Sequence, residues 1–430
     1  MSSDNSLEFT LRDILAAINP TGDDWSARLR LIEELRVVVR SLESLRGATV
    51  EPYGSFASNL FTRWGDLDVS IELPNGSYIS MSFGKKHKQT LLQDVLKSLR
   101  RRGGWQKLQF IANARVPILK CKSSYLNISC DISINNLNGQ MKSKLLFWIN
   151  EIDRRFRDMV LLVKEWAKAH DINDSKSGTF NSYCLSLLVI FHFQTCTPAI
   201  LPPLQEIYPR NMVDDLRGVR ADAEKNIEET CAENIYRFRS DKSRMRNYSS
   251  LSELFISFLA KFSDISSRAP EQGISPCSGQ WENIETNTRW QPKTYALFVE
   301  DPFEQPANTA RTVNQRNLSR ISETFQTTHQ MLISGNQDYN SVLATLVGPQ
   351  VSQFLQRRPV HNPRPRAYIS QNSRARPQTD RAVNLSMQGQ NQFQNARVDR
   401  RPNTNGATMQ RTVNAAQNQV QQVWRPRSDR

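Results

Sequence analysis

The sequence predicts an α+β protein of two lobes, followed by a C-terminal tail without stable structure. Between about residues 46 and 138, apolar residues alternate as they do in β-strands, whereas before and after this region they recur at helical spacing. The last 80 residues differ again, because 14 Arg stand against three Asp and no Lys, a net charge of +11 within the chain's +14. A nearly balanced globular body therefore precedes a basic tail.

The sequence argues against a membrane or secreted protein. The longest apolar run, Leu187–Phe193, is far shorter than the roughly 18 residues that a membrane span needs, and the opening MSSDNSLEFT lacks the features of a secretory signal. The six cysteines form no C-x-x-C pair, so we expect reduced thiols. We expect an intracellular protein without a membrane partner, located in the cytoplasm or the nucleus.

The body divides into three predicted parts. Residues 1–45 carry two helical patterns, Leu7–Ala17 and Trp25–Leu45, which we expect to pack on the helical lobe. Residues 46–138 are predicted to form a sheet-containing domain, with a helix at Leu91–Arg102 and five strands: VEPY, DLDVSIEL, WQKLQFIANA, RVPILKCK and YLNISCDISI. Residues 139–345 form the helical lobe, whose main pieces are LLFWINEIDRRFRDMVLLVKEWAKAH, SYCLSLLVIFHFQTC, LSELFISFLAKF and LSRISETFQTTHQML.

Residues 346–430 form the predicted disordered tail. Its 13 Gln and nine Asn after residue 350, with few large aliphatic residues and no sustained period, bury too little apolar surface to offset the entropy of ordering. Arg scattered among Gln and Asn suits a flexible arm for polyanions or for self-association. An inert solubilising tail is the alternative interpretation.

Three aspartates are the main candidates for chemistry. Side chains alternate along a strand, so Asp66 and Asp68 face one way while the apolar residues between and after them face a core. Asp131 repeats this pattern in a later strand, and the three acids converge if the two strands are neighbours. Carboxylates that lie so close together repel one another and stay ionised mainly when a cation compensates their charge. Carboxylates beside a phosphate substrate favour Mg²⁺ or Mn²⁺.

A Gly-Ser pair precedes the acids. Gly54-Ser55, at a predicted strand-to-helix turn, offers backbone N–H groups to a phosphate. A lone D-x-D or a lone Gly-Ser is usually an ordinary feature of a surface strand or turn, but their combination with a third strand-borne Asp is specific. It resembles the signature h-G-S … D-h-D-h … h-D-h of the DNA polymerase β-like nucleotidyltransferases. The resemblance implies that Asp66, Asp68 and Asp131 hold two catalytic metal ions.

Three segments of the helical lobe add further candidates. Lys164 and Lys168 are four residues apart and share a helix face, where paired ammoniums suit a triphosphate. The alternative interpretation is that they are ordinary solvated lysines. Ser182 and Tyr183 open a helix that Thr179 or Asn181 can cap, where they could bind a phosphate and stack on a base. The segment FVEDPFE, residues 298–304, predicts a strand that enters a turn.

Together these motifs, over about residues 45–335, resemble the non-canonical poly(U) and poly(A) polymerases with a PAP-associated domain. The resemblance implies that Lys164 and Lys168 contact the triphosphate, that Ser182 and Tyr183 hold a phosphate and the base, and that two acids lie at the base-recognition edge. These acids are Asp301 and Glu304. Lys142 stands where that family commonly has an Asn beside the ribose 2′-hydroxyl.

Longer stretches such as VLLVKEWAKAHDIN and LFVEDPFEQPANTAR are similar to the plant terminal uridylyltransferases that tail small RNAs lacking a 3′ methyl group. This likeness implies UTP as substrate, RNA 3′ ends as acceptors and Argonaute proteins as partners. Many uridylyltransferases have a His where this chain has Ala307, so a non-canonical poly(A) polymerase stays open as an alternative. A catalytically weak RNA- or Argonaute-binding scaffold is the alternative from another class. The clusters Lys85–Lys88 and Arg100–Arg102 are predicted RNA contacts or solvated surface.

Overall fold

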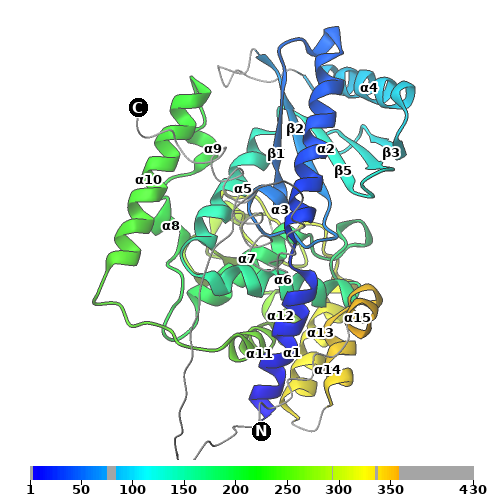
Figure 1. Cartoon of the computed structure of the whole chain (residues 1–430). Coiled ribbons are helices and arrows are strands. Elements are labelled where there is room, and N and C mark those ends of the chain that lie inside the picture. Colours follow the sequence, from blue (N-terminus) through cyan, green and yellow to red (C-terminus); the bar gives the residue numbers. More distant parts are fainter. Residues whose placement is uncertain (1–2, 75–83, 293, 335–337, 358–430) are drawn as a thin grey trace, which may run out of the picture.

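A computed structural model describes residues 3–74, 84–292, 294–334 and 338–357. Figure 1 shows the two lobes, with the sheet and helices α2 and α4 at the top, α10 beside the sheet and most of the other helices below. The predicted two-lobed α+β fold is confirmed. None of the helices in the described ranges is long and apolar enough to span a membrane.

A five-stranded mixed sheet forms the catalytic lobe. Its order is β1-β2-β5-β4-β3, in which β2 and β5 run parallel and every other neighbouring pair is antiparallel. The strands are β1 (Thr49–Tyr53), β2 (Leu67–Glu72), β3 (Trp105–Ile111), β4 (Ile118–Ser123) and β5 (Ser129–Ile134). A short helix, α3 (Gly54–Ala57), follows β1 directly. The sequence therefore predicted all five strands to within a few residues.

One apolar core lies between the sheet and two helices. Alternation places Leu67, Val69 and Ile71 of β2 in this core, at most 1% exposed. The helices α2 (Gly22–Arg40) and α4 (Lys85–Arg102) cover them, and a 3₁₀ turn at Glu43–Leu45 follows α2. Because the core takes one face of the central strands, the other face is left for polar side chains.

The helical lobe surrounds two buried helices, α6 and α7. Residues Cys184–Gln194 of α7 are all buried, as expected for a helix that is apolar on every side. The helices of the lobe are α1 (Ser3–Ile18), α5 (Leu137–Asn150), α6 (Arg154–Ala169), α7 (Ser182–Gln194), α8 (Leu204–Ile207), α9 (Met212–Asp215), α10 (Arg220–Ser240), α11 (Leu251–Phe262), α12 (Ile265–Arg268), α13 (Gln315–Ile333), α14 (Tyr339–Leu346) and α15 (Pro349–Gln356). A hairpin of β6 (Gln272–Ser275) and β7 (Gln280–Asn283) and two 3₁₀ turns, Ser175–Ser177 and Thr288–Trp290, complete it.

Three predictions about the division of the chain were wrong: those for one helical piece, for one N-terminal helix and for the start of the tail. The piece from Leu145 to His170 is two helices, because the Asp153 side chain accepts the N–H of Arg155 and starts α6 anew. Of the helices in residues 1–45, α1 joins the core of the helical lobe, but α2 belongs to the sheet core through Trp25 and its apolar stripe.

The predicted tail also begins too early. Residues 349–356 form α15, whose Val351 is buried and which packs on α1. Residues 358–430 lie outside the described residues, and so does the prediction of a disordered tail.

Candidate active site

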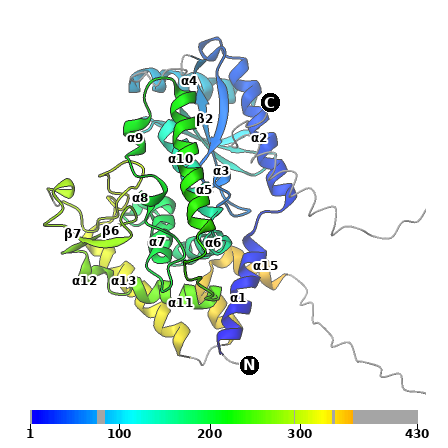
Figure 2. The same cartoon turned by 90° about the vertical axis from the view of Figure 1, so that its left-hand side faces the viewer.

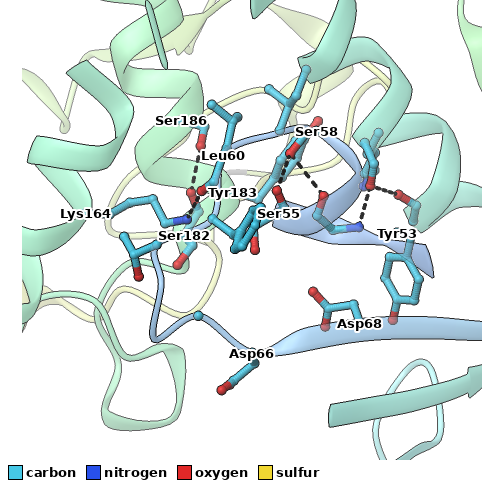
Figure 3. A pocket seen from close by; sticks show the side chains of 18 of the residues that line it. Tyr53, Ser55, Ser58, Leu60, Asp66, Asp68, Lys164, Ser182, Tyr183 and Ser186 are labelled. Carbon is cyan, nitrogen blue, oxygen red and sulfur yellow. Dashed lines mark hydrogen bonds between the residues drawn. The ribbon is translucent and has the colours of Figure 1, made fainter. Parts of the chain in front are cut away.

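A cavity of about 570 Å³ lies between the two lobes, and Figure 3 shows it from close by. Nine of the twelve predicted site residues line it: Gly54, Ser55, Asp66, Asp68, Lys142, Lys164, Lys168, Ser182 and Tyr183. The other three, Asp131, Asp301 and Glu304, lie outside the cavity lining but contact or adjoin residues near it. Acids of the sheet thus face cations and hydroxyls of the helical lobe across one space.

Gly54 brings the turn after β1 close to the acids. Its φ of +69° lies in the left-handed region, and a Cβ at this position would collide with the Asp68 carboxylate. Its N–H donates to Ser143 Oγ at 2.7 Å. This N–H is therefore engaged within the protein, and the phosphate contact predicted for the Gly-Ser pair rests on the rest of the turn and on the Ser55 side chain, which lines the cavity.

Strand pairing brings two of the acids together. Asp68 on β2 and Asp131 on β5 stand opposite each other in the parallel register. Burial, followed by repulsion from Asp131 and Asp66, raises the pKa of Asp68 from 3.8 to about 7. Asp66 precedes β2 and is exposed, and Figure 3 shows its carboxylate directed away from that of Asp68.

Lys120 is a neighbour of the acids that the sequence analysis missed. It stands opposite Asp131 on β4, and its ammonium is ion-paired with that carboxylate. Burial lowers the pKa of Lys120, but the hydrogen bond and charge of Asp131 outweigh this and raise it. The alternation of β4 could have revealed it, since Leu119 and Cys121 on either side face the core.

The donor chemistry fits the predicted divalent ions. Among the described residues, no three His, Cys, Asp or Glu side chains converge closely enough to enclose a metal, and Lys120 meets Asp131 instead. The acids nevertheless offer only oxygen donors, which suit Mg²⁺ or Mn²⁺. The raised pKa of Asp68 reflects a repulsion that a bound cation would relieve.

The two lysines of α6 approach the cavity from the helical lobe. Lys164 is only 7% exposed, and its Nζ donates to the carbonyl of Leu60 at 3.0 Å. Burial, followed by repulsion from Lys168, lowers the pKa of Lys164 to about 8. Lys168 pairs with Glu165 at 2.8 Å and is half exposed. The predicted shared face of the two ammoniums is therefore present.

Ser182 and Tyr183 lie in the first turn of α7. The Asn181 side chain caps this helix by accepting the N–H of Cys184, as predicted. The Tyr183 hydroxyl donates to Asp301 Oδ1 at 3.1 Å, which fixes the ring at the cavity wall. Burial raises the pKa of Tyr183 well above its ordinary value. The ring therefore forms part of the cavity lining.

Asp301 and Glu304 hold Lys142 at this wall. The Lys142 Nζ lies 2.5 Å from Asp301 Oδ2 and 2.7 Å from Glu304 Oε2, and 5.2 Å from the centre of the Tyr183 ring. Glu304 also pairs with Arg115 in the loop between β3 and β4. The two acids thus position Lys142 and join the lobes, instead of lining the cavity themselves.

The loop between α3 and β2 supplies a wall that no sequence motif indicated. Trp64 in this loop lines the cavity, and its ring packs edge-on against Phe354 of α15 with centroids 5.6 Å apart. From the sheet side, the buried guanidinium of Arg28 donates to the carbonyls of Arg63 and Gly65. The loop that carries Asp66 is therefore held from both lobes.

Comparison with known proteins agrees with this geometry. Residues 7–151 match a family model described as the central palm domain of mitochondrial-like poly(A) RNA polymerase. The chain is 59% identical over 357 residues to Protein HESO1 of Arabidopsis thaliana, a match that covers 83% of this chain and 70% of that protein. The chain belongs to the HESO1 family. The predicted membership of the plant terminal uridylyltransferase group, and of the RNA nucleotidyltransferases as an enzyme class, is confirmed.

More distant relatives of the HESO1 family share the body of the chain. Poly(A) RNA polymerase cid11 of Schizosaccharomyces pombe is 26% identical over 74% of this chain, and GLD2 of Mus musculus is 28% identical over 74%. The chain spans 61% of the length of each. The fold matches a Cid1 poly(U) polymerase structure with a TM-score of 0.60 at 23% identity, covering 78% of this chain and 97% of that one. It also matches mtPAP in complex with UTP at 0.60 and 20% identity, covering 80% and 71%.

Proposed function

We propose that this protein adds uridines from UTP to the 3′ ends of RNA without a template. One observation carries the proposal: a single cavity has carboxylates of the sheet on one side and ammoniums, hydroxyls and an aromatic ring of the helical lobe on the other. Such a set matches the parts of a nucleoside triphosphate, namely its metal-bound phosphates and its base. The membership of the HESO1 family supports the same assignment.

The reaction joins an RNA 3′-hydroxyl to the α-phosphate of the nucleotide and releases pyrophosphate. Asp66, Asp68 and Asp131 would hold two Mg²⁺ or Mn²⁺ ions, which supply electrostatic stabilisation of the attacking and leaving oxygens. Lys164 and Lys168 neutralise triphosphate charge from the opposite wall.

The base is held by Tyr183 and the residues behind it. Its ring stacks on the base, while Lys142, held by Asp301 and Glu304, lies beside the ring and can reach a base or ribose oxygen. Ala307 lies in the turn after these acids, where its carbonyl accepts the N–H of Asp301 at 2.8 Å. Because a small residue stands there, selection of uracil falls to Lys142 and Tyr183. A poly(A) polymerase is the second candidate, because relatives such as cid11 and GLD2 carry that name.

We further propose that the acceptors are small RNAs without a 3′-terminal methyl group and Argonaute-related fragments, and that Argonaute proteins are partners. The resemblance to plant uridylyltransferases supports this proposal, and so does the Arg-rich sequence of the last 80 residues. We place the protein in the cytoplasm, including RNA granules, and in the nucleus. Self-association through the tail belongs to the same proposal.

A primer-extension assay tests the chemistry. Purified protein is incubated with labelled small RNA that ends in a free 2′,3′-diol, with Mg²⁺ or Mn²⁺ and with each nucleoside triphosphate separately. We expect a ladder with UTP, a much weaker one with ATP, and none from Asp68→Asn, which keeps the size of the side chain. Asp23→Asn, an exposed acid of α2, is the matched control and should extend normally.

The outcomes separate the candidates. An ATP ladder equal to or stronger than the UTP ladder would favour a poly(A) polymerase, and extension by Asp68→Asn would remove the assignment of the acids. A 2′-O-methylated acceptor that extends as well as the diol would exclude the proposed discrimination between small RNAs.

A further inference from the structure

A basic and aromatic surface lies far along the chain from every motif of the candidate site. It consists of the last turn of α10 and the loop that follows it, Tyr236–Tyr248, which we call the α10 surface. We propose that the α10 surface binds single-stranded RNA and holds the body of the substrate while its 3′ end occupies the cavity. The inference rests on the proposed function in one respect, that the substrate is RNA.

The charges of the α10 surface are unbalanced. The sequence YRFRSDKSRMRNY contains four Arg and one Lys but only one acid, Asp241. The Asp241 carboxylate is engaged by the N–H and hydroxyl of Ser243. Arg239 and Arg246 are exposed, and neither forms an ion pair within the described ranges. Their guanidiniums are therefore available to phosphate groups.

The loop is held in a defined shape. Arg155 of α6 donates to the side chain and the carbonyl of Asn247, while Asp153 binds the same guanidinium. Arg244 stacks over the Phe238 ring at 4.0 Å and donates to the carbonyls of residues 199 and 200. A surface fixed in this way loses little conformational entropy when a ligand binds.

Two hollows adjoin Arg239. One, of about 310 Å³, is lined by Arg155, Arg239, Arg244, Arg246 and Tyr248 together with Asp153, Asp241 and uncharged neighbours. The other, of about 560 Å³, is lined by Trp148, Tyr236 and Arg239, with Glu151 as its one acid. Cationic and aromatic side chains thus line both hollows.

The exposed aromatic residues point to nucleic acid. Tyr236 is 73% and Tyr248 86% exposed, and with Met245 they are three of the eight large hydrophobic residues that are exposed within the described ranges. Base stacking on such rings, combined with Arg contacts to phosphates, is the usual chemistry of single-strand binding. An acidic peptide would use the guanidiniums but would leave the rings without partners.

The α10 surface lies within reach of an RNA whose end is in the cavity. In Figure 2, α10 lies in front of α5, and the hollow beside Arg239 is also lined by Arg155 of α6. Arg155 and Lys164 lie nine residues apart on α6, which is about 14 Å along the helix axis. A stacked strand covers this distance in about four nucleotides. A trinucleotide is therefore too short to touch both places.

The test compares long and short RNA. Arg239→Gln/Arg246→Gln removes two cations, Tyr236→Ala/Tyr248→Ala removes two rings, and Arg30→Gln/Arg40→Gln on α2 is a control with the same loss of charge. Binding of a labelled single strand of about 20 nucleotides is measured by fluorescence anisotropy over a salt series. Extension of that strand and of a trinucleotide is measured beside it.

We expect the Arg pair to raise Kd about fivefold or more and to reduce the salt slope by about 1.4 in magnitude, as for two lost phosphate contacts. The Tyr pair should raise Kd about fivefold or more through lost stacking. In both variants the trinucleotide should extend at the wild-type rate, and the control should bind as the wild type does.

Unchanged Kd and slope in both variants would overturn the proposal, and so would an equal loss in the control or an equal loss with the trinucleotide. Loss of binding to a polyglutamate peptide with RNA binding intact would assign the surface to an acidic protein instead. These binding results do not depend on catalysis. Failure of the wild type to extend any RNA would count against the proposed function alone.

Discussion

Replacement of Asp68 by Asn should stabilise the metal-free protein while it abolishes activity. The pKa of Asp68 is raised from 3.8 to about 7 by burial and by its acidic neighbours. At pH 7 and above, this difference corresponds to about 4 kcal/mol of unfavourable free energy that the charged group contributes to folding. Because Asp68 is half-buried, solvent screening reduces this value, and we expect about 2 kcal/mol.

The sign of the pH dependence follows from proton binding. Between about pH 4 and 7 the folded protein keeps a proton on Asp68 that the unfolded chain has lost. The stability of the wild type should therefore fall relative to Asp68→Asn as the pH rises through this window, and the two should converge near pH 4. A bound divalent cation should reverse the order, because it binds only the native wild type; about 100 times its Kd would add about 2.7 kcal/mol.

Urea denaturation with EDTA and with Mn²⁺, at several pH values, measures these differences directly. The exposed control Asp23→Asn should stay within about 0.5 kcal/mol of the wild type throughout. An Asp68→Asn protein that is no more stable than the wild type in EDTA at pH 7 would refute the reasoning. A stability gap that does not shrink toward pH 4 would refute it as well.

Three further predictions concern the cavity walls. Since the pKa of Lys164 is lowered to about 8, the amine becomes neutral above pH 8, and KM for UTP should rise there. Steady-state kinetics of Lys164→Arg should show no such rise, because Arg stays charged. Arg28→Met should lower the free energy of unfolding by about 3 kcal/mol, because the carbonyls of Asp24, Arg63 and Gly65 lose their hydrogen-bond donor. Urea denaturation measures this change. A decrease of less than about 1 kcal/mol would contradict the role of Arg28. Ala307→His should increase the ratio of kcat/KM for UTP to that for ATP, because the larger side chain reduces the space for a purine. Nucleotide competition measures this ratio, and an unchanged ratio would contradict the prediction.

Local sequence patterns predicted the sheet and nine of the residues that line the cavity. The alternation around Asp68 and Asp131 placed each acid on the polar face of its strand, and strand pairing then brought the two together. Ser182 and Tyr183 followed from the cap of α7, which depends only on residues nearby in the chain. Such features depend on residues that are neighbours in the chain, so they can be predicted from the sequence.

Features that depend on tertiary contacts could not be predicted. The alternation of β4 places Lys120 on the polar face of the sheet, but only the register of β4 against β5 sets it opposite Asp131. The assignment of α2 to the sheet core and the packing of Phe354 on Trp64 likewise join residues far apart in the sequence. The pairing of Glu304 with Lys142 and with Arg115 also joins residues far apart in the sequence.

The division of the N-terminal helices has a mechanical consequence. The chain passes from the helical lobe to the sheet lobe between α1 and α2, at residues 19–21, and returns between β5 and α5, at residues 135–136. Two covalent connections define an axis, so the lobes can rotate about the line that joins them, whereas sliding or twisting would stretch one connection. The Arg157 guanidinium of α6 donates to Asn19 Oδ1 in the first connection, at 2.7 Å. We expect any opening of the cavity to follow this hinge, so that the acids and the lysines return to the same positions when it closes.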